Sequence, residues 1–466
     1  MVKYLVALLG WVDERFPVSK VWNEHLAKYY APKNFNFWYF FGSLAMLVLV
    51  LQLLTGLWLT MHYKPDATLA FDSVEYIMRD VNWGWLIRYL HSTGASAFFI
   101  VVYMHMFRGM MYGSYKKPRE VIWLLGMAMF LALMGEAFMG YLLPWGQMSY
   151  WGAQVIISLF GAIPWVGEAL AQWIRGDYLI SDATLNRFFA FHVMLIPLIL
   201  VVLVYVHIVA LHHVGSNNPD GIEIKKHKNA DGVPVDGIPF HPYYTVKDLV
   251  GVAVFALVFA WVVFYAPEMN GLFLEYANFI PANPIATPEH IAPVWYFTPF
   301  YSILRAVPNK LGGVIAMFSA IILLFLLPWL DRCRTRSIRY RSPFYKIGLG
   351  IFTVSFLGLG YLGTQPVTPA ATLLAQLFSL VYFVFFLAMP VYSRWDQGQP
   401  VPERLTPNIP ILERPGLPWC VLRWLVDKIQ AHPQYQKLMP VVTARAEDVY
   451  NKLPPFIKVQ VERFCK

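Results

Sequence analysis

Four histidines in two apolar segments have the spacing of stacked metal ligands. His91 and His105 lie 14 residues apart, and His192 and His207 lie 15 residues apart. A helix turns by about −40° over 14 residues and about +60° over 15, so each pair shares roughly one helix face. If two such helices run side by side in the same direction, His91 faces His192 and His105 faces His207, at depths ~21 Å apart. Because neutral imidazole is a good axial ligand of haem iron, this pattern indicates two bis-histidine haems.

The alternative for any one of these histidines is a core residue that is satisfied by hydrogen bonds. Inside a membrane span, however, ionisable side chains are costly and usually functional. Four histidines at two matching depths therefore favour ligation. A metal ion held by protein ligands alone fits less well, because no carboxylate or Cys shares these faces and four ligands at two depths cannot enclose one ion.

Glycines with the same 14-residue interval occur in the two neighbouring apolar segments. Gly42 and Gly56 lie in the segment before the first histidine pair, and Gly126 and Gly140 lie in the segment after it. Glycine lacks a side chain, so these positions let a flat macrocycle approach the backbone at two depths. Ordinary packing of helices through small residues is the alternative explanation.

Two arginines lie one helical turn from the first histidine pair. Arg88 precedes His91 by three residues, and Arg108 follows His105 by three. Near a membrane face, a guanidinium group can pair with a haem propionate. A snorkelling arginine that only extends its charge to water is the alternative.

The composition sets the class of protein. The chain has 466 residues, 58% of them hydrophobic, and a mean hydropathy of +0.48, with the apolar residues in long blocks. These values indicate an all-α polytopic membrane protein. The net charge of +9 lies in short loops between the blocks, so we expect no nucleic-acid partner. Cys333, Cys420 and Cys465 form no CxxC or CxxCH unit, which argues against a c-type haem attachment, an iron–sulfur cluster and a disulfide framework.

The blocks predict eight membrane spans, the first four of which we expect to form a di-haem four-helix bundle. The spans are expected at about 37–60, 85–110, 121–143, 186–211, 248–266, 312–330, 347–363 and 370–391. The long segment 144–185 is expected to hold interfacial helices too short to span. The first residues, MVKYLVALLGWVDERF, contain an apolar run that is too short to span and lacks a cleavage site, so no signal peptide is expected.

Five regions follow from this pattern. We expect an interfacial segment at 1–36, the di-haem bundle at 37–215, a cytoplasmic loop at 216–247, four further spans at 248–395 with an outer loop at 267–310, and a cytoplasmic tail at 396–466. The tail is predicted to contain an amphipathic helix near Trp419–Ile429.

Loop charge predicts the orientation. The loops after the second, fourth and sixth spans carry clusters of Lys or Arg, whereas the alternate loops are acidic or mixed. Positive loops remain in the cytoplasm, so both termini are expected there. The second and fourth spans then run in the same direction, as the pairing of the histidines requires.

The motifs in order strongly resemble cytochrome b, the haem subunit of the cytochrome bc complexes, or quinol–cytochrome c reductases. The resemblance covers nearly all of residues 35–395. The matching segments include RYLHSTGASAFFIVVYMHMFRGMMYGSY, GYLLPWGQMSYWGA, RFFAFH, GSNNPDGI, FHPYYTVKDLVG, APVWYF, RAVPNKLGGV and GTQPV.

The resemblance implies a role for each histidine pair and two quinone sites. His91 and His192 would ligate a low-potential haem b on the outer side, and His105 and His207 would ligate a high-potential haem b on the cytoplasmic side. The residues that match the outer quinol-oxidation pocket are Gly152, Pro293, Trp295 and Tyr296. Those that match the cytoplasmic quinone-reduction pocket are His212, Ser216, Lys247 and Asp248.

The resemblance also implies an activity and partners. Quinol would be oxidised at the outer site, with one electron leaving to a Rieske-type iron–sulfur protein and the other crossing both haems to reduce quinone. This Q cycle contributes to proton translocation, and the chain would be catalytic only together with the iron–sulfur protein and a membrane-anchored c-type cytochrome. A dimeric complex in the bacterial inner membrane, surrounded by lipids, is expected.

The outer motif departs from the pattern of many family members, which have Pro-Glu-Trp-Tyr. This chain has Val294 between Pro293 and Trp295, and valine cannot accept a proton. We hypothesise that Glu136, an acid within the third span, takes that role, because a buried acid there is costly. A structural hydrogen bond for Glu136, or proton exit through Tyr296 and water, are the alternatives.

The second departure is the 15-residue interval of the second histidine pair. Mitochondrial-type members have 14, and the split photosynthetic relatives have 15. Pro197 lies within the interval and is predicted to kink or locally rewind the helix so that both rings come into place. Because the chain is not split and its first span has no Cys, the respiratory or anoxygenic-photosynthetic bacterial type is favoured.

Two other functions compete with this interpretation. A proton-coupled transporter would have inverted repeats and paired acids at mid-membrane, which the sequence does not show. Another di-haem membrane cytochrome would explain the histidines but not the long outer loop with its PVWY motif.

Overall fold

Among the residues that the structure, a computed structural model, describes, eight helices are long and apolar enough to cross a membrane. The structure describes residues 2–396 and 398–405. The eight candidate spans are Phe37–Thr60, Gly84–Tyr112, Glu120–Leu142, Asp182–Val214, Phe240–Tyr265, Lys310–Leu330, Pro343–Thr364 and Pro369–Leu387. The predicted number of spans is confirmed. The fourth is longer than expected because the helix begins before the apolar block. The tail helix predicted near Trp419–Ile429 lies outside the described residues.

The elements follow one another in a nearly all-helical order. The helices are α1 Val2–Asp13, α2 Val18–Trp22, α3 Phe40–Thr60, α4 Ala70–Arg79, α5 Gly84–Tyr112, α6 Glu120–Leu142, α7 Gln147–Phe160, α8 Gly167–Arg175, α9 Asp182–Ala190, α10 Ile196–Val214, α11 Thr245–Tyr265, α12 Thr298–Ala306, α13 Lys310–Leu330, α14 Pro343–Thr364, α15 Pro369–Leu387 and α16 Met389–Trp395. Strands β1 Tyr30–Pro32 and β2 Gly237–Pro239 pair antiparallel, with Tyr30 opposite Pro239. Short π-helical turns cover Asn23–Ala27, Phe191–Leu195 and Phe240–Tyr244, and 3₁₀ turns cover Phe37–Tyr39, Ile224–Lys226 and Tyr276–Phe279.

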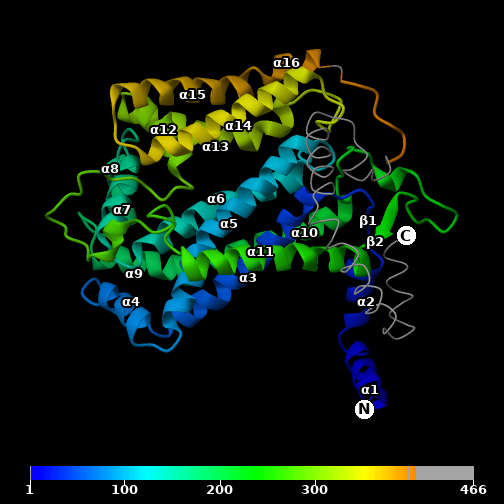
Figure 1. Cartoon of the computed structure of the whole chain (residues 1–466), viewed down its shortest axis with the longest axis horizontal. Coiled ribbons are helices and arrows are strands. Elements are labelled where there is room, and N and C mark those ends of the chain that lie inside the picture. Colours follow the sequence, from blue (N-terminus) through cyan, green and yellow to red (C-terminus); the bar gives the residue numbers. More distant parts are fainter. Residues whose placement is uncertain (1, 397, 406–466) are drawn as a thin grey trace, which may run out of the picture. The chain divides into compact units, whose positions relative to one another are not determined.

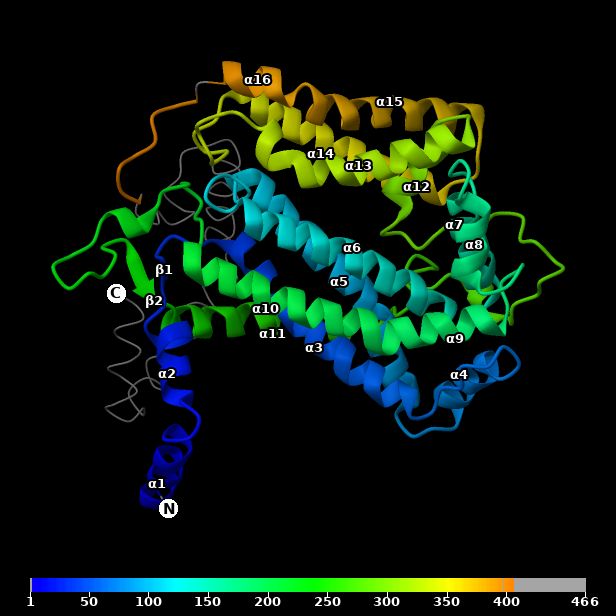
Figure 2. The ribbon, with the colours of Figure 1, turned by 180° about the vertical axis from the view of Figure 1, so that it is seen from behind.

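The helices form two groups. The first group is the four-helix bundle of α3, α5, α6 and the continuous helix made by α9 and α10, and α11 packs against α3 and α5. The second group, α12 to α16, lies along one side of this bundle, where α13 contacts α6 (Figures 1 and 2). The segment between the third and fourth spans holds α7 and α8, which are too short to span, as expected.

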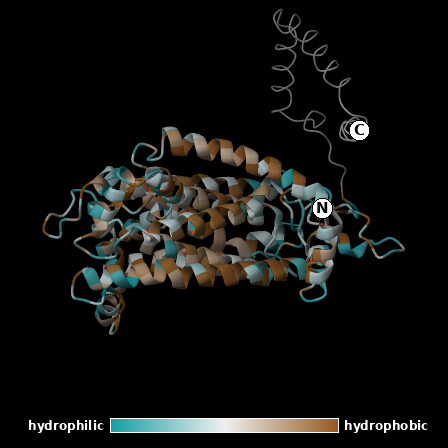
Figure 3. Ribbon diagram, turned by 90° about the horizontal axis from the view of Figure 1, so that it is seen from below, coloured by the Kyte–Doolittle hydropathy of each residue, from teal (hydrophilic) through white to brown (hydrophobic). Residues whose placement is uncertain are grey.

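Apolar side chains remain exposed along the spans. Leu257 of α11 is 74% exposed and Val202 of α10 is 53% exposed, although both helices are strongly hydrophobic. Figure 3 shows hydrophobic colour along the spans and hydrophilic colour in many of the connecting segments. A helix that is hydrophobic on its exposed face is suited to lipid contact, so these faces fit a bilayer.

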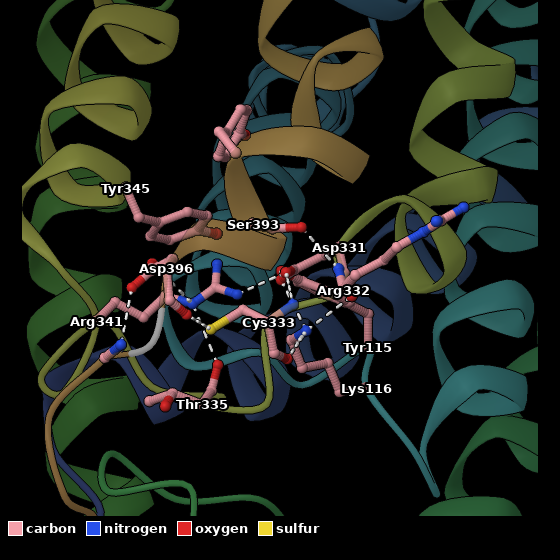
Figure 4. Close-up of polar contacts among 12 residues, drawn as sticks. Tyr115, Lys116, Asp331, Arg332, Cys333, Thr335, Arg341, Tyr345, Ser393 and Asp396 are labelled. Carbon is pink, nitrogen blue, oxygen red and sulfur yellow. Dashed lines mark hydrogen bonds and ion pairs between the residues drawn. The ribbon is translucent and has the colours of Figure 1, made fainter.

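A buried charged cluster joins the loop after α5 to the loop after α13 (Figure 4). Asp331 accepts hydrogen bonds from Arg341 Nη2 at 2.5 Å and from the Tyr115 hydroxyl at 2.5 Å, and it pairs with Lys116 Nζ at 3.0 Å. The side chains of Asp331 and Arg341 have no exposed surface. Gly113 ends α5 with a φ of +63° and lies against the backbone of Arg336, a conformation and a close approach that suit glycine. The cluster therefore fixes the two helix groups at this end.

Candidate haem and quinone sites

The outer histidine pair is brought together by α5 and the fourth span. The ring centres of His91 and His192 lie 6.2 Å apart. An imidazole nitrogen binds a metal at about 2 Å, so two imidazoles on opposite sides of one iron have ring centres roughly 6 Å apart. The observed separation therefore fits a shared haem iron, and it is the pairing that the sequence predicted.

Hydrogen bonds fix which nitrogen of each ring is left for a metal. The Thr55 hydroxyl donates its only proton to the Leu51 carbonyl at 2.7 Å, so it accepts from His91 Nδ1 at 2.9 Å. His192 Nδ1 lies 2.9 Å from the carbonyl oxygen of Glu136, which can only accept. Both Nδ1 atoms are then donors, and both Nε2 atoms keep the lone pair that a metal needs. Thr55 was not singled out from the sequence, because no spacing marks a hydroxyl that acts on another helix.

A π-helical turn brings the 15-residue interval of the second pair into register. The turn spans Phe191–Leu195, contains His192, and is closed by the Ile196 N–H, which donates to the Phe191 carbonyl. A π turn closes from i to i+5 and takes up one residue more than an α turn, so 15 residues rotate about as far as 14 do in the first pair. The prediction of a local rewinding near Pro197 is confirmed. Pro197 follows in the first turn of α10.

Each of the four spaced glycines lies against one of the four histidines. The space at each glycine is measured by the distance that an added β-carbon would have to the Cε1 atom of the neighbouring histidine ring. The distances are 3.3 Å for Gly42 and His105, 3.1 Å for Gly56 and His91, 3.6 Å for Gly126 and His207, and 2.3 Å for Gly140 and His192. A larger residue would press on the rings most strongly at Gly140. The glycine interval therefore matches the histidine interval because each glycine leaves room for one ring.

The inner pair, His105 and His207, is accompanied by Arg108. The guanidinium Nη2 of Arg108 lies 3.3 Å from His105 Nδ1, and the group stacks over the Tyr39 ring at 4.8 Å. Its Nε is buried and finds no hydrogen-bond partner among the described residues. A buried cation with an unused donor fits an anionic group such as a haem propionate.

A cavity of about 760 Å³ contains the outer pair and continues beyond it. This is within the range of small-molecule and cofactor sites, about 300–1,000 Å³. Its lining includes Arg88, Gly56, His91, Glu136, Gly140, Tyr141, His192, Asn278, Val294 and Tyr296. The space beside the outer ligands is thus continuous with the PVWY segment. The residues present fit a haem with a second ligand next to it.

The four residues matched to the outer quinone pocket differ in how they meet this cavity. Tyr296 lines it, stacks on Phe99 with ring centres 3.9 Å apart, and is buried, which raises the pKa of its hydroxyl. Pro293, Trp295 and Gly152 lie outside the lining. Trp295 donates to Ser96 Oγ at 3.0 Å. A β-carbon on Gly152 would lie 3.8 Å from the Tyr141 ring, so this buried glycine packs behind the cavity wall.

Glu136 lies beside the outer ligand. Its Oε1 is 3.0 Å from His192 Nδ1, and its Oε2 is buried without a hydrogen-bond partner among the described residues. The carboxylate therefore belongs to the surroundings of the histidine. Its suggested role as proton acceptor stays a prediction.

The residues matched to the cytoplasmic quinone pocket gather around the N-terminal segment. The ring of His212 lies 4.4 Å from that of Tyr29, whose hydroxyl is 2.9 Å from Ser216 Oγ. Lys247 donates to the Phe35 carbonyl at 2.6 Å, and Asp248 follows it on α11. Segment 29–35 thus contacts His212 and Ser216 at the end of the fourth span and also Lys247 of α11. Tyr29 and Phe35 were missed from the sequence because their positions depend on the pairing of β1 with β2.

Comparisons with known proteins agree with this geometry. Residues 26–215 match the family described as cytochrome b/b6/petB, and residues 281–383 match cytochrome b(C-terminal)/b6/petD. Cytochrome b of Allochromatium vinosum is 64% identical over 85% of this chain and 98% of its own length. Cytochrome b of Rhodospirillum rubrum is 51% identical over 85% of this chain and 96% of its own length.

A solved structure supports the same assignment. A chain of a hyperthermophilic respiratory Complex III has a TM-score of 0.78 and 39% identity, and the match covers 84% of this chain and 99% of that one. With family matches to both halves and relatives of high identity over most of its length, the chain belongs to the cytochrome b family.

Proposed function

We propose that this chain holds two b haems and couples quinol oxidation on the outer side to quinone reduction on the cytoplasmic side. His91 and His192 ligate the low-potential haem, and His105 and His207 ligate the high-potential haem. The observation that carries the proposal is the outer pair: two rings 6.2 Å apart, each with its Nδ1 hydrogen-bonded, in a cavity that extends to Tyr296. When bound, the haems supply one-electron transfer across the membrane.

The chain's own residues position the ligands and the quinones. Arg88 and Arg108 pair with propionates, and Gly42, Gly56, Gly126 and Gly140 leave room beside the rings. Tyr296 bounds the outer quinol site, with Pro293, Trp295 and Gly152 supporting its wall. His212, Ser216, Lys247 and Asp248 bind quinone on the cytoplasmic side, where they hydrogen-bond its oxygens and supply protons.

The activity belongs to the whole complex. A Rieske-type iron–sulfur protein accepts the outward electron, and a membrane-anchored c-type cytochrome receives it next. The complex is dimeric, contacts membrane lipids and resides in the bacterial inner membrane. Both termini of this chain lie in the cytoplasm, because the loops after α5, α10 and α13 are basic and basic loops remain on that side. In this proposal the chain has the five regions that the sequence predicts, from the interfacial segment at 1–36 to the cytoplasmic tail at 396–466. Relatives named cytochrome b favour this function over a proton-coupled transporter or another di-haem membrane cytochrome.

Replacement of single ligands tests the proposal. In the purified complex, His192→Leu should remove the outer haem and His207→Leu the inner one, each leaving one b-type haem in the reduced-minus-oxidised spectrum. Both variants should lose quinol–cytochrome c reduction. His213→Leu is the matched control, because this exposed histidine of α10 lies outside both pairs and should leave both haems in place. Two b haems in either ligand variant would refute the assignment.

A further inference from the structure

The PVWY segment brings no carboxylate to the outer cavity, but the outer loop holds one that is hydrogen-bonded to the cavity lining. Glu275 accepts a hydrogen bond from the Tyr141 hydroxyl at 2.7 Å. Asn278 donates to the same hydroxyl at 2.8 Å, and its Nδ2 lies 3.3 Å from Glu275 Oε2. Tyr141 and Asn278 line the cavity. Glu275 does not, so it stands one hydrogen bond behind the wall.

The three side chains form an oriented relay. Because the Tyr141 hydroxyl gives its proton to Glu275 and receives one hydrogen bond from Asn278, its second lone pair is free to accept from a donor in the cavity. The Asn278 amide is neither an acid nor a base at physiological pH, so it takes no part in proton transfer. Its donated hydrogen bond holds the Tyr141 hydroxyl in this orientation. Glu275 itself lies in the outer loop, and its side chain is half-buried.

The surroundings of Glu275 suit a group that gains and loses a proton near neutrality. Burial raises the pKa of its carboxyl to about 7, against an opposing effect of the hydrogen bond from Tyr141. The titratable groups that face it are the hydroxyls of Tyr141, from α6, and Tyr296, from the PVWY segment. A base with such a pKa is matched to proton transfer at physiological pH.

We propose that Glu275, acting through the Tyr141 hydroxyl, is the proton acceptor for quinol oxidation in this chain. The quinol hydroxyl gives its proton to the Tyr141 oxygen while the Tyr141 proton passes to the Glu275 carboxylate. Quinol becomes its monoanion, Tyr141 is unchanged, and Glu275 becomes a neutral acid that later releases its proton at the outer face. Oxidation of the monoanion to quinone then releases two electrons to the one-electron acceptors of the proposed function, on which this inference rests. The second proton follows the same route once Glu275 has released the first.

Replacement of Glu136, the acceptor suggested by the sequence, is expected to have a different effect from replacement of Glu275. Its carboxylate contacts His192 Nδ1, so its removal should change the ligand and the spectrum of the outer haem. Removal of Glu275 should leave both haems spectrally unchanged, since none of its hydrogen bonds reaches a histidine.

The test compares Glu275→Gln with the wild-type chain in the purified complex. Reduction of the b haems by added quinol is measured by rapid mixing from about pH 5.5 to about pH 9, with quinone reduction on the inner side blocked. The wild-type rate should rise with pH through about 7 as the carboxyl of Glu275 loses its proton. Glu275→Gln should lower the rate by at least ~10-fold above that pH and remove this ionisation from the profile.

Two further variants separate proton transfer from a structural role. Glu275→Asp keeps a carboxylate and should recover part of the rate together with the ionisation. Glu268→Gln is the matched control, because Glu268 lies in the same loop and accepts a hydrogen bond from Tyr89 at 3.3 Å. It should keep the wild-type rate and profile. In infrared spectra, Glu275→Gln should lack the band of a protonated carboxyl that titrates near pH 7, and Glu268→Gln should retain it.

The outcomes distinguish this inference from the proposed function. If Glu275→Gln keeps the wild-type rate and pH profile while both haems are reduced normally, Glu275 is not the acceptor and the proposed function stands. If the wild-type complex does not reduce its haems with quinol at all, the proposed function itself fails.

Discussion

At the scale of single residues, each histidine of the outer pair depends on neighbours from other helices. Thr55 and the Glu136 carbonyl hold the two Nδ1 atoms, and Gly56 and Gly140 leave space beside the rings. The contact at Gly140 is the closest of the four, because a β-carbon there would lie 2.3 Å from His192 Cε1. The ring cannot retreat without losing its hydrogen bond to Glu136. Glycine is therefore required most strictly at this position.

We expect Gly140→Ala to lose the outer haem, whereas Gly126→Ala keeps the inner one. The added β-carbon at position 140 overlaps the His192 ring, but at position 126 it would lie at an ordinary contact distance of 3.6 Å from His207. Haem content per chain and the reduced-minus-oxidised spectrum measure the difference. Equal retention of two haems in both variants would show that the glycines serve only helix packing.

At the scale of helices, the fourth span contains a local irregularity that aligns its two histidines on one face. Its two histidines are 15 residues apart, and a regular α-helix would turn them about 100° further than the pair on α5. The π turn at Phe191–Leu195 absorbs the extra residue next to His192. Pro197 lacks an N–H and so cannot donate the α-helical bond that would reach back into this turn. Helix geometry, rather than a shift of the whole span, thus aligns the ligands.

Changes in chain length test this register. Deletion of Val193 leaves 14 residues between the ligands, which a regular α-helix aligns, so both haems should be retained. Insertion of one alanine after Leu203 leaves 16, which turns one ring away by about 100°, and one haem should be lost. Haem content of the two purified variants decides this. Loss on deletion together with retention on insertion would contradict the proposed role of the π turn.

At the scale of the whole molecule, buried charged side chains connect the four-helix bundle to the second helix group. Asp331, at the end of α13, accepts hydrogen bonds from Arg341 and Tyr115 and forms an ion pair with Lys116 (Figure 4). Burial acts against its ionised form, but the charges of Arg341 and Lys116 hold the pKa of Asp331 below its usual range. A charged cluster without exposed surface is stable only while its members are complete.

We expect Asp331→Ala to destabilise the chain by about 3–5 kcal/mol, because Arg341 and Lys116 would stay buried without their counter-charge. The thermal unfolding midpoint of the detergent-solubilised complex should fall accordingly. Glu14→Ala is the control. It breaks the exposed pair with Arg15, whose side chains are 54% (Arg15) and 75% (Glu14) exposed, and should leave the midpoint unchanged. A similar midpoint for both variants would show that the cluster does not hold the helix groups together.

The sequence by itself determined the spans, the pairing of His91 with His192, and the place of the glycines. These depend on segment length and helical period, which act within one helix and can be read along the chain. The tertiary structure decided which nitrogen is free in His91 and His192, where the register is corrected, and how Glu275 meets Tyr141, 134 residues away. Such contacts join separate helices and loops, and only their packing brings the groups within hydrogen-bonding distance.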